Sequence, residues 1–287
     1  MRPRPAAPLP DPLHGGSPLP TQINLHPAED VAPETPPAST RARRERSAAG
    51  RTPAVRPPNG WYPTVKLAAD FVLALLLTVV ALPVMAVCGL AVKLTSRGPA
   101  FYTQTRVGRG GRPFTIYKLR TMIHNCESLT GPRWSIPGDP RVTPVGWVLR
   151  ATHLDELPQL LNVLRGEMSL IGPRPERPEF IPQLERALPA YRQRLTVLPG
   201  VTGLAQVKLP ADTDLDSVRR KLAHDLYYIE RMSFWLDLRL LLGTGLYAAG
   251  VKPQLTGRLI RVPDSAAIER TMYGIVGDAL PQRRMSA

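Results

Sequence analysis

The sequence has few cysteines and few acidic residues for its length. Its 287 residues include two cysteines, Cys88 within an apolar run and Cys126 within a polar stretch. Two cysteines in such settings form neither a disulfide framework nor a metal-binding spacing, so a reducing compartment is the simpler interpretation. Asp and Glu number 23 against 37 Lys and Arg, and the formal net charge is +14. This excess predicts a negatively charged partner but does not choose among nucleic acid, anionic lipid and a phosphate-rich substrate.

The chain also lacks the motifs of common nucleotide-binding and nucleic-acid-binding classes. The turn GRGG at 108–111 resembles a phosphate-binding loop only superficially, because no Gly-Lys-Ser/Thr follows it and no helix is predicted to begin there. No aromatic platform is interleaved with the basic residues. These absences argue against a P-loop and against nucleic acid as the partner.

Residues 1–60 have no sustained apolar run, and they carry 14 of the 33 prolines. Such a segment buries too little apolar surface to offset the entropy of ordering it, so we predict a disordered, proline-rich tail. About 225 residues remain, which is enough for one hydrophobic core.

One long apolar run, residues 71–92, has 22 positions without a charge. As a helix it is roughly 33 Å long, enough to cross a bilayer core of about 30 Å. The run fits a signal peptide poorly, because it begins 70 residues into the chain, is too long for a typical apolar region of a signal peptide and has no obvious cleavage context. Membrane insertion is the prediction, with a buried helix of a soluble protein as the alternative.

Two features argue against a simple spanning helix. Pro83 lies in the middle of the run, where it removes a backbone hydrogen bond and favours a kink. Both flanks are basic, and the positive-inside tendency would place both on the cytoplasmic side. We therefore predict a helix that is broken at Leu82 and Pro83, enters the membrane and returns. A spanning helix that tolerates the proline is the alternative.

The segment 98–120 is predicted to form short strands around the GRGG turn, because β-prone residues lie on both sides of it. The polar, Pro- and Gly-rich segment 124–144 that follows is predicted to be a mobile loop. Neither segment carries a recognisable catalytic pattern by itself.

A helix is predicted after residue 153. Pro158 is tolerated only in the first turn of a helix, so this helix begins near Leu154 or Asp155. Asp155 and Glu156 then lie in the first turn, where the helix dipole favours the ionised carboxylate that a nucleophile needs. The alternative is that Asp155 merely caps the helix. The apolar stripe of this helix is Leu157, Leu160, Leu161 and Leu164.

The segment IGPRPERPEF at 171–180 has three prolines around Arg174 and Arg177. Prolines stiffen a loop, and a stiff loop can hold a guanidinium where it matches phosphate oxygens. A solvated surface turn is the alternative. Downstream, residues 195–207 are predicted to form a turn and a strand, and residues 214–233 a helix. Residues 234–250 fit either an interfacial membrane helix or a helix packed on the core.

These residues resemble a known family, the monotopic phosphoglycosyl transferases, which are bacterial sugar transferases that initiate glycoconjugate assembly on polyprenyl phosphate. The resemblance spans about residues 61–250. It rests on the order of five motifs: the proline-broken apolar helix, GPAFYTQTRVGRGG, FTIYKLRTM, LDELPQLLNVLRGEMSLIGPRP and PGVTGLAQV.

The resemblance implies a covalent mechanism. Asp155 would attack the β-phosphate of a UDP-sugar, release UMP and later pass the sugar phosphate to undecaprenyl phosphate, the polyprenyl acceptor. Glu156, together with Asp155, would hold Mg²⁺. Arg150 and Arg174 match active-site arginines of the family. Lys118 and Arg120, within FTIYKLRTM, are also expected to bind substrate.

The resemblance also implies the architecture and the location. The expected fold is a membrane-associated α/β protein with a re-entrant helix at 61–97. A small mixed α/β catalytic domain with interfacial amphipathic helices would follow at 98–250, and a C-terminal extension at 251–287. The catalytic domain would lie on the cytoplasmic face of the bacterial inner membrane, in exopolysaccharide or lipopolysaccharide synthesis. With only the tail before it, the chain would be the minimal catalytic form.

Two departures from the family pattern leave questions open. Many members follow AQV with Gly-Arg-Asn, but here the sequence is KLPADTD, and Lys208, Arg219 or Arg220 are the candidate replacements. His153 stands where a serine is frequent. We expect the sugar-selecting residues in 124–144 or near KLPADTD, but neither the sugar nor the oligomeric state follows from the sequence.

Two other kinds of protein compete with this assignment. One is a membrane-anchored basic scaffold or nucleic-acid-binding protein without catalysis, for which no binding motif is present. The other is a transferase that moves only the sugar and releases UDP.

Overall fold

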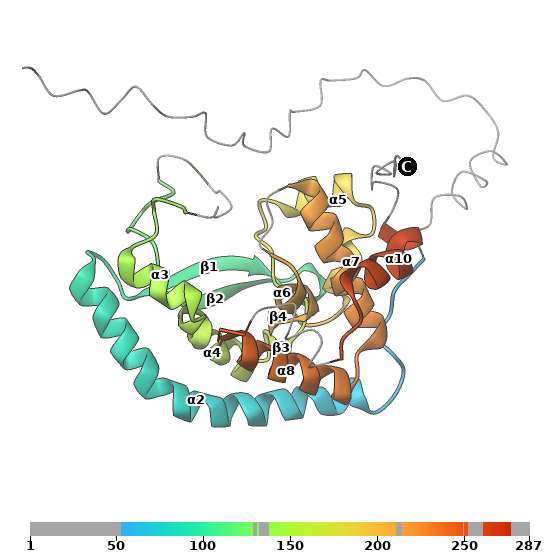
Figure 1. The fold of residues 1–287 in the computed structure, drawn as a ribbon, viewed down its shortest axis with the longest axis horizontal. Coiled ribbons are helices and arrows are strands. Elements are labelled where there is room, and N and C mark those ends of the chain that lie inside the picture. The colour runs from blue at the N-terminus through green and yellow to red at the C-terminus, as the bar shows by residue number, and fades with distance from the viewer. Residues whose placement is uncertain are drawn as a thin grey trace, which may run out of the picture. The chain divides into compact units, whose positions relative to one another are not determined.

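The computed structural model describes residues 53–128, 131, 138–210, 214–248, 250–251 and 261–276 (Figure 1). Its elements are α2 (Tyr62–Thr95), β1 (Phe101–Val107), η1 (Arg109–Gly111), β2 (Pro113–Leu119), α3 (Pro144–Ala151), η2 (Leu154–Gln159), α4 (Leu160–Leu164), β3 (Ser169–Ile171), α5 (Ile181–Ala187), η3 (Tyr191–Thr196), β4 (Gly200–Thr202), α6 (Leu204–Lys208), α7 (Leu215–Arg231), α8 (Phe234–Ala248) and α10 (Ser265–Val276). The mixed helix and strand content agrees with the expected class.

The helix α2 is 34 residues long and is, among the described residues, the one helix with the length and hydropathy to cross a membrane. It packs against α3, α4, η2, β2 and β3 along one face and exposes apolar side chains on the other. The buried stripe is Lys66, Asp70, Ala74, Thr78, Ala81, Met85, Gly89 and Val92. This spacing of three and four residues is that of one helix face.

The predicted break at Leu82 and Pro83 does not occur, because α2 continues through both residues. A proline removes one backbone hydrogen bond, and neighbouring turns can sustain the helix while it bends. The ribbon of α2 does change direction along its length (Figure 1). Whether Pro83 acts as a membrane hinge stays a prediction.

A buried polar network joins α2 to α8. Lys66 Nζ lies 2.5 Å from Asp237 Oδ2 and 3.2 Å from Asp70 Oδ2. The hydroxyls of Tyr62 and Tyr228 donate to Asp237 at 2.6 and 2.8 Å. Asp237 is a charged residue near the start of α8, which is otherwise mostly apolar. The network explains its presence there, because Asp237 is buried and its oxygens all have partners.

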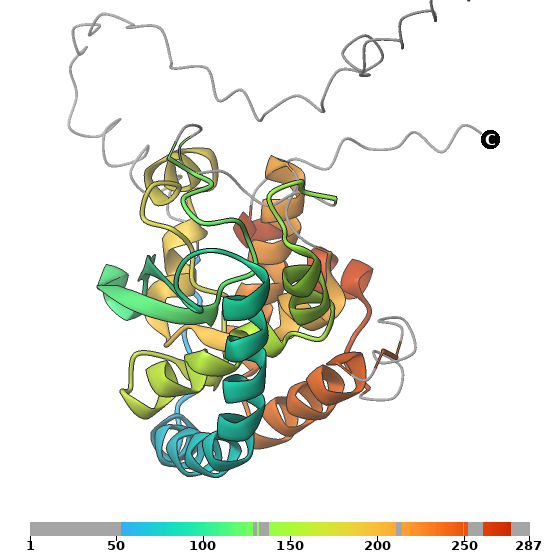
Figure 2. The same cartoon turned by 90° about the vertical axis from the view of Figure 1, so that its left-hand side faces the viewer.

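The helix α8 combines the two alternatives considered for residues 234–250. Leu236 and Leu240 are buried in the core, whereas Trp235 and Leu242 are exposed. Figures 1 and 2 both show α2 and α8 along the same side of the domain. Contact with a membrane interface is not tested by this packing.

The strands flanking the GRGG turn are confirmed. β1 and β2 pair antiparallel from Phe101 opposite Leu119 to Val107 opposite Pro113. Gly110 and Gly111 have φ of 69° and 81°, a left-handed region that glycine enters without strain. The backbone of the turn therefore accounts for these two glycines.

The predicted helix at 214–233 is also confirmed as α7. Asp214 and Ser217 form a reciprocal capping box, in which the Asp214 side chain accepts from Ser217 N at 2.7 Å. α10, in the C-terminal extension, packs against α7 with Ile268 and Met272 buried.

At the other end of the described chain, Val55 is buried in the core and its N–H donates to Gln193 at 2.6 Å. Val55 falls within the predicted tail, residues 1–60. Residues 1–52 of that tail lie outside the described part of the chain.

The strand predicted within 195–207 is shorter than expected. β4 has three residues and pairs with β3 in parallel, and the following LAQVK forms α6. The sequence LAQV alternates too briefly to distinguish a strand from one helical turn. The ladder ends there because Gly203, in extended conformation, becomes the N-cap of α6.

The loop after β3 passes very close to the backbone of β4 and of the residue that follows it. Gly172, Gly200 and Gly203 permit this close approach. A Cβ added at Gly200 would lie 2.1 Å from Gly172 N, and one at Gly203 would lie 2.2 Å from Gly172 O. The backbones meet through hydrogen bonds from Gly172 N to Thr202 O and from Gly200 N to Pro173 O, both of 2.9 Å. The segment that follows β3 and the segment of β4, which are far apart in sequence, are thus held together through their backbones.

We predict that Gly203→Ala lowers the free energy of unfolding by about 2 kcal/mol or more, because the new methyl group has only backbone to displace. The control is Gly245→Ala in α8, where an added Cβ meets nothing within 4 Å. Urea unfolding in detergent measures both variants. Equal stability of the two would contradict the close approach described above.

Candidate active site

The acid pair lies where the sequence predicts it, in the first turn of η2. The helix begins as a 3₁₀ turn and becomes α-helical at Leu160, so the expected stripe changes phase, and Leu161 is 41% exposed. The N-cap is His153, with φ of 57°, and no side chain caps the turn. The alternative that Asp155 merely caps this helix is therefore wrong.

Glu156 is held between two cations from different elements. Lys118 of β2 places Nζ 2.7 Å from Oε1, and Arg174 donates to Oε1 at 2.5 Å and to Oε2 at 3.1 Å. Burial alone would raise the pKa of the Glu156 carboxyl, but attraction to Arg174 and Lys118 outweighs it and holds that pKa well below its usual range. Glu156 is thus a permanent anion whose oxygens are all engaged.

Asp155 is in the opposite situation. Its residue is 7% exposed, and its carboxylate forms no hydrogen bond or ion pair with any residue that the structure describes. Burial raises the pKa of Asp155, and Lys118 and Arg174 counteract that increase. The effect of burial therefore exceeds the stabilisation that we expected from the first turn of a helix. Two adjacent carboxylates consequently differ in partners and in proton affinity.

The other expected cations lie at different distances from this pair. Arg150, in the last turn of α3, donates from Nε to Thr121 Oγ1 at 2.8 Å, and its charge lowers the pKa of Asp155. Arg120 instead binds the C-terminal end of α2, donating to Ser96 O at 2.9 Å and to the carbonyl of Arg97. The structure therefore brings Lys118, Arg150 and Arg174 to the acid pair, but not Arg120.

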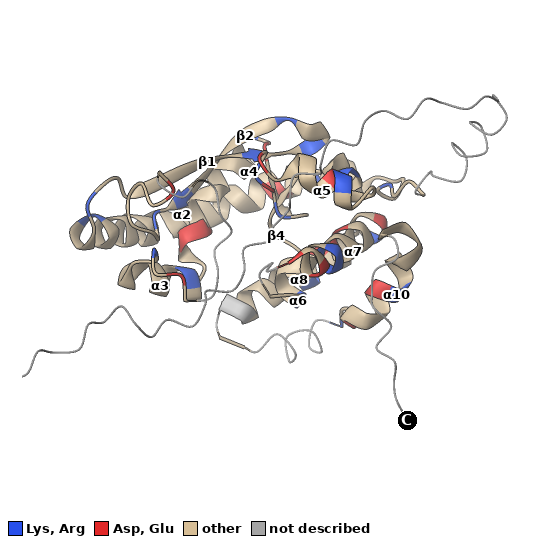
Figure 3. Ribbon diagram, turned by 90° about the horizontal axis from the view of Figure 1, so that it is seen from above, with Lys and Arg blue, Asp and Glu red and all other residues tan. Residues whose placement is uncertain are grey.

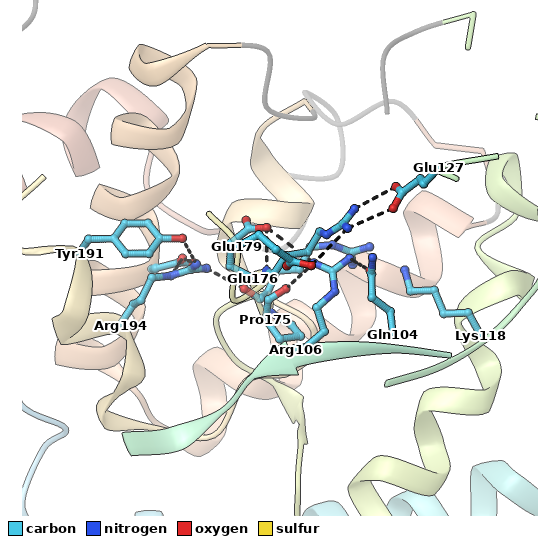
Figure 4. Close-up of polar contacts among 12 residues, drawn as sticks. Gln104, Arg106, Lys118, Glu127, Pro175, Glu176, Glu179, Tyr191 and Arg194 are labelled. Carbon is cyan, nitrogen blue, oxygen red and sulfur yellow. Dashed lines mark hydrogen bonds and ion pairs between the residues drawn. The ribbon is translucent and has the colours of Figure 1, made fainter. Parts of the chain in front are cut away.

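The loop after β3 is not a solvated turn, because Pro173, Pro175 and Arg177 are buried. Arg177 donates to both oxygens of Glu127, at 2.9 and 3.1 Å. Arg106 of β1 donates to Pro175 O at 3.0 Å (Figure 4). These contacts hold the backbone that carries Arg174.

Arg194 was not anticipated from the sequence. It is almost fully buried, pairs with Asp225 at 2.6 Å, and donates to the carbonyl of Arg174 at 2.7 Å (Figure 4). It also donates to the Tyr191 hydroxyl at 2.7 Å and, from Nε, to Asp225 at 2.9 Å, so several contacts fix the guanidinium. No local pattern marks it, because its partners lie 20 and 31 residues away in sequence.

A pocket of about 730 Å³ extends from this cluster. Its polar end includes Arg106, Glu156 and Arg174. Leu154 and Glu156 line the pocket, whereas Asp155 between them does not. Its apolar wall comes from α2, α8 and the segment after α6, with Leu77, Val80, Ala81, Val84, Leu209, Pro210 and Leu241. The pocket joins a charged region to the exposed apolar side of the molecule.

One more cation lines this pocket, Lys221 of α7. The candidates from sequence, Lys208, Arg219 and Arg220, are not among the described residues of its wall. Arg219 instead pairs with Asp216 at 2.6 Å. Residues 129–130, 132–137 and 211–213, in the segments expected to select the sugar, lie outside the described part.

The family model described as bacterial sugar transferase matches residues 61–249. The chain belongs to the bacterial sugar transferase family. The matched range contains the acid pair, its cations and every element that lines the pocket, so the resemblance drawn from the five motifs is confirmed.

Relatives within the family act on nucleotide sugars and undecaprenyl phosphate, according to their names. A UDP-N-acetylgalactosamine-undecaprenyl-phosphate N-acetylgalactosaminephosphotransferase of Aeromonas hydrophila is 43% identical over 187 residues, which are 65% of this chain and 44% of that protein. A UDP-glucose:undecaprenyl-phosphate glucose-1-phosphate transferase of Caulobacter vibrioides is 46% identical over 194 residues, 65% of this chain and 72% of that protein. An exopolysaccharide production protein of Rhizobium leguminosarum bv. phaseoli is 38% identical over 185 residues, which are 63% of this chain and 92% of that protein.

The acid pair of this bacterial sugar transferase also fits a magnesium ion that is shared with a substrate. No group of three or more His, Cys, Asp or Glu side chains comes together within the described part of the chain. Mg²⁺ commonly takes one or two carboxylates and completes its shell with water and substrate phosphates. Asp155 and Glu156 meet that need, although Glu156 would have to share its oxygens with Lys118 and Arg174.

We predict that Glu156→Gln lowers the free energy of unfolding at pH 7 by about 3 kcal/mol, because it leaves Lys118 and Arg174 without their buried anion. The folded-state pKa of Glu156 is lowered. The stabilisation that the Glu156 carboxylate gives the folded protein is therefore complete at pH values above the ordinary glutamate pKa of about 4.3. It is lost as the pH falls towards the folded-state pKa of Glu156. Urea unfolding between pH 7 and 3.5 should show this loss in the unsubstituted protein and not in the variant.

The control for this measurement is Glu230→Gln, which removes an exposed carboxylate that forms a 3.7 Å ion pair with the exposed Arg231. Exposed pairs contribute little, so its stability should stay within about 0.5 kcal/mol of the unsubstituted protein. An equally small effect of Glu156→Gln would show that the three-residue cluster does not stabilise the fold.

Proposed function

We propose that this bacterial sugar transferase moves a sugar 1-phosphate from a UDP-sugar to undecaprenyl phosphate, with release of UMP. The observation that carries the proposal is the division between two adjacent carboxylates, of which Glu156 lines the polar end of an amphipathic pocket and Asp155 lies buried beside it. Glu156 is fully paired with cations, whereas Asp155 has no partner among the described residues. The names of the Aeromonas and Caulobacter relatives support both substrates, and the name of the Rhizobium relative supports a role in exopolysaccharide synthesis.

The reaction takes two displacements at one phosphorus atom. A carboxylate oxygen of Asp155 attacks the β-phosphorus of the UDP-sugar, and the bond from that phosphorus to the oxygen bridging the α-phosphate breaks. UMP leaves with that oxygen, and the sugar phosphate stays on Asp155 as an acyl phosphate ester. A phosphate oxygen of undecaprenyl phosphate then attacks the same phosphorus, and the Asp155 oxygen leaves as the carboxylate.

The chain's own cations make an attack by an anion on an anion feasible. Lys118, Arg174 and Arg150 all act on Asp155 electrostatically, and removing one such contact typically lowers a rate on the order of a hundredfold. Mg²⁺, held by Asp155 and Glu156 when bound, would add charge neutralisation at the diphosphate. Lys221 supplies a further cation in the pocket wall.

Asp155 must become accessible for this chemistry, since it is almost buried and outside the described pocket wall. Leu154 and Glu156 on either side of it do line the pocket. The proposal therefore requires that the substrate phosphates recruit cations now engaged with Glu156 and so expose Asp155. Such a rearrangement is local, because the backbone of Arg174 is fixed independently by Arg194.

The apolar wall suits the polyprenyl chain of the acceptor. Leu77, Val80 and Val84 of α2 line the pocket, and all three are exposed on the apolar side of the molecule. A lipid phosphate embedded in a bilayer would reach the polar end from there, with its chain still in contact with α2. This geometry supports the membrane as a partner.

The re-entrant course of α2 forms part of the proposal. Near its start, Lys66 is paired with Asp237 of α8, and at its end, Ser96 and Arg97 are bound by Arg120 of the segment after β2. Both ends of α2 are thus attached to one domain, which cannot lie on both sides of a bilayer. With its basic flanks, α2 would enter and leave on the cytoplasmic face of the inner membrane.

We predict that Asp155→Asn lowers UMP release at least a thousandfold, because an amide is not a nucleophile for this displacement. A panel of radiolabelled UDP-sugars with undecaprenyl phosphate and Mg²⁺ measures it. Labelling of the intact protein by the β-phosphate, lost on addition of the lipid acceptor, should depend on Asp155. Near-normal turnover of the variant would rule out the covalent route.

The same assay separates the competing classes. A transferase that moves only the sugar would release UDP in place of UMP. A basic scaffold would release neither, and its binding to nucleic acid would weaken steeply with salt.

We predict that single cysteines at Thr64 and Arg97, both exposed and close to the ends of α2, react from the same side of sealed inverted vesicles. A cysteine-free background, with Cys88 and Cys126 replaced, allows a membrane-impermeant maleimide to report each site. Labelling from opposite sides would contradict the re-entrant helix, while the assignment of Asp155 would stand.

A further inference from the structure

A second pocket lies beside the first half of α2, away from the acid pair. Its volume is about 290 Å³, at the small end of ligand pockets, which are about 300 to 1,000 Å³. Its wall consists of Leu67, Asp70, Phe71, Arg109, Val163, Leu164, Arg165, Gly166, Met168 and Leu198. No residue is shared with the larger pocket, and the proposed reaction uses none of these side chains.

Two arginines give this pocket unused hydrogen-bond donors. Neither Arg109 nor Arg165 forms a side-chain hydrogen bond or ion pair with another residue of the described part of the chain. The guanidinium carbon of Arg165 lies over the ring of Tyr117, 4.9 Å from its centroid, in cation–π contact. Guanidinium groups match phosphate oxygens in geometry as well as in charge.

The acid in the pocket does not neutralise these arginines. Asp70 pairs with Lys66 at 3.2 Å and accepts a hydrogen bond from Ser169 at 2.6 Å, so its charge is already committed. Arg109 belongs to the GRGG turn, and Figure 3 shows basic residues gathered at the end of the β1–β2 hairpin that this turn forms. The pocket therefore presents net positive charge.

The remaining wall is apolar and continues onto the exposed face of α2. Leu67 and Phe71 are 46% and 47% exposed, and Leu75, one turn further along α2, is exposed as well. An occupant of this pocket thus meets both guanidinium groups and an apolar surface. Among common cellular ligands, a phospholipid with an anionic headgroup has this division.

We infer that Arg109 and Arg165 bind the headgroup phosphate of an anionic phospholipid, whose acyl chains lie against Leu67 and Phe71. The inference rests on the proposed membrane insertion of α2. The site would orient the domain on the bilayer beside, and separately from, the entry of the polyprenyl substrate. It also gives the GRGG turn a role that its lack of a P-loop sequence had left open.

The test uses the full chain in a neutral maltoside detergent, mixed with phosphatidylglycerol or phosphatidylcholine. The rise in melting temperature with lipid concentration gives an apparent affinity. We expect phosphatidylglycerol to stabilise the protein more than phosphatidylcholine, and Arg109→Gln with Arg165→Gln to weaken its apparent affinity at least tenfold. UMP release in the same detergent should be unchanged by this double variant.

The matched control is Arg186→Gln with Arg231→Gln, which removes the same charge at two exposed positions outside the pocket. It should retain the response to phosphatidylglycerol. Arg109→Gln alone serves as a second variant, since that exposed side chain has no polar partner in the described structure whose loss would unfold the protein. It should show a partial loss.

Three results would overturn the inference. They are an equal response of the two double variants, an equal response to the two lipids, and the same stabilisation by inorganic phosphate at matched concentration, which would indicate a small-anion site. The proposed function fails in a different way. Absence of UMP release by the unsubstituted protein with any UDP-sugar would contradict the transferase assignment and leave the lipid response intact.

Discussion

A charge that is removed from water requires partners, and Lys66 meets this requirement near the start of α2, where that helix packs on the rest of the domain. Its ammonium lies between Asp70 on its own helix and Asp237 on α8, and Tyr62 and Tyr228 satisfy Asp237 further. Rotating α2 or withdrawing it would leave buried carboxylates without a cation. A helix that is otherwise apolar all round therefore has one orientation on the domain.

The same network reaches the acid pair through a short covalent path. Asp70 accepts from Ser169, the first residue of β3, and Tyr228 donates to Ile171 at its end. Three residues later comes Arg174, whose backbone is fixed by Arg194 and whose side chain holds Glu156. The glycines of the close approach around β4 permit this route, because any side chain there would separate β3 from β4. The helix α2 and the acid pair are parts of one connected polar structure.

Local chemistry made much of this predictable. Pro158 limits where η2 starts, GRGG indicates the hairpin turn, and Asp214 with Ser217 marks the start of α7; each acts within four residues. The expectations that were wrong or missing depend on distant partners. LAQV becomes a helix because Gly203 meets Gly172, and Arg120 binds Ser96, 24 residues earlier. The role of Arg194 depends on Arg174 and Asp225, and Lys221 lines the pocket through the docking of α7 on α6. The resemblance identified Arg174 where composition did not, since a Pro-Arg loop has the same local sequence whether it is buried or solvated.

The pairing of Glu156 explains how two neighbouring carboxylates can have different tasks. Left unpaired, Glu156 would add its full negative charge to Asp155 and raise the pKa of Asp155 further. Lys118 and Arg174 offset that charge and also attract the anion of Asp155, so the same two cations fix Glu156 and counteract the rise in the pKa of Asp155. An incoming diphosphate competes for these cations. Transfer of Lys118 and Arg174 from Glu156 to the phosphates would leave the carboxylates of Asp155 and Glu156 less screened from each other. Repulsion by Glu156 would then favour attack of the Asp155 anion on phosphorus. In the proposed reaction, substrate binding and the reactivity of Asp155 would therefore both depend on Lys118 and Arg174.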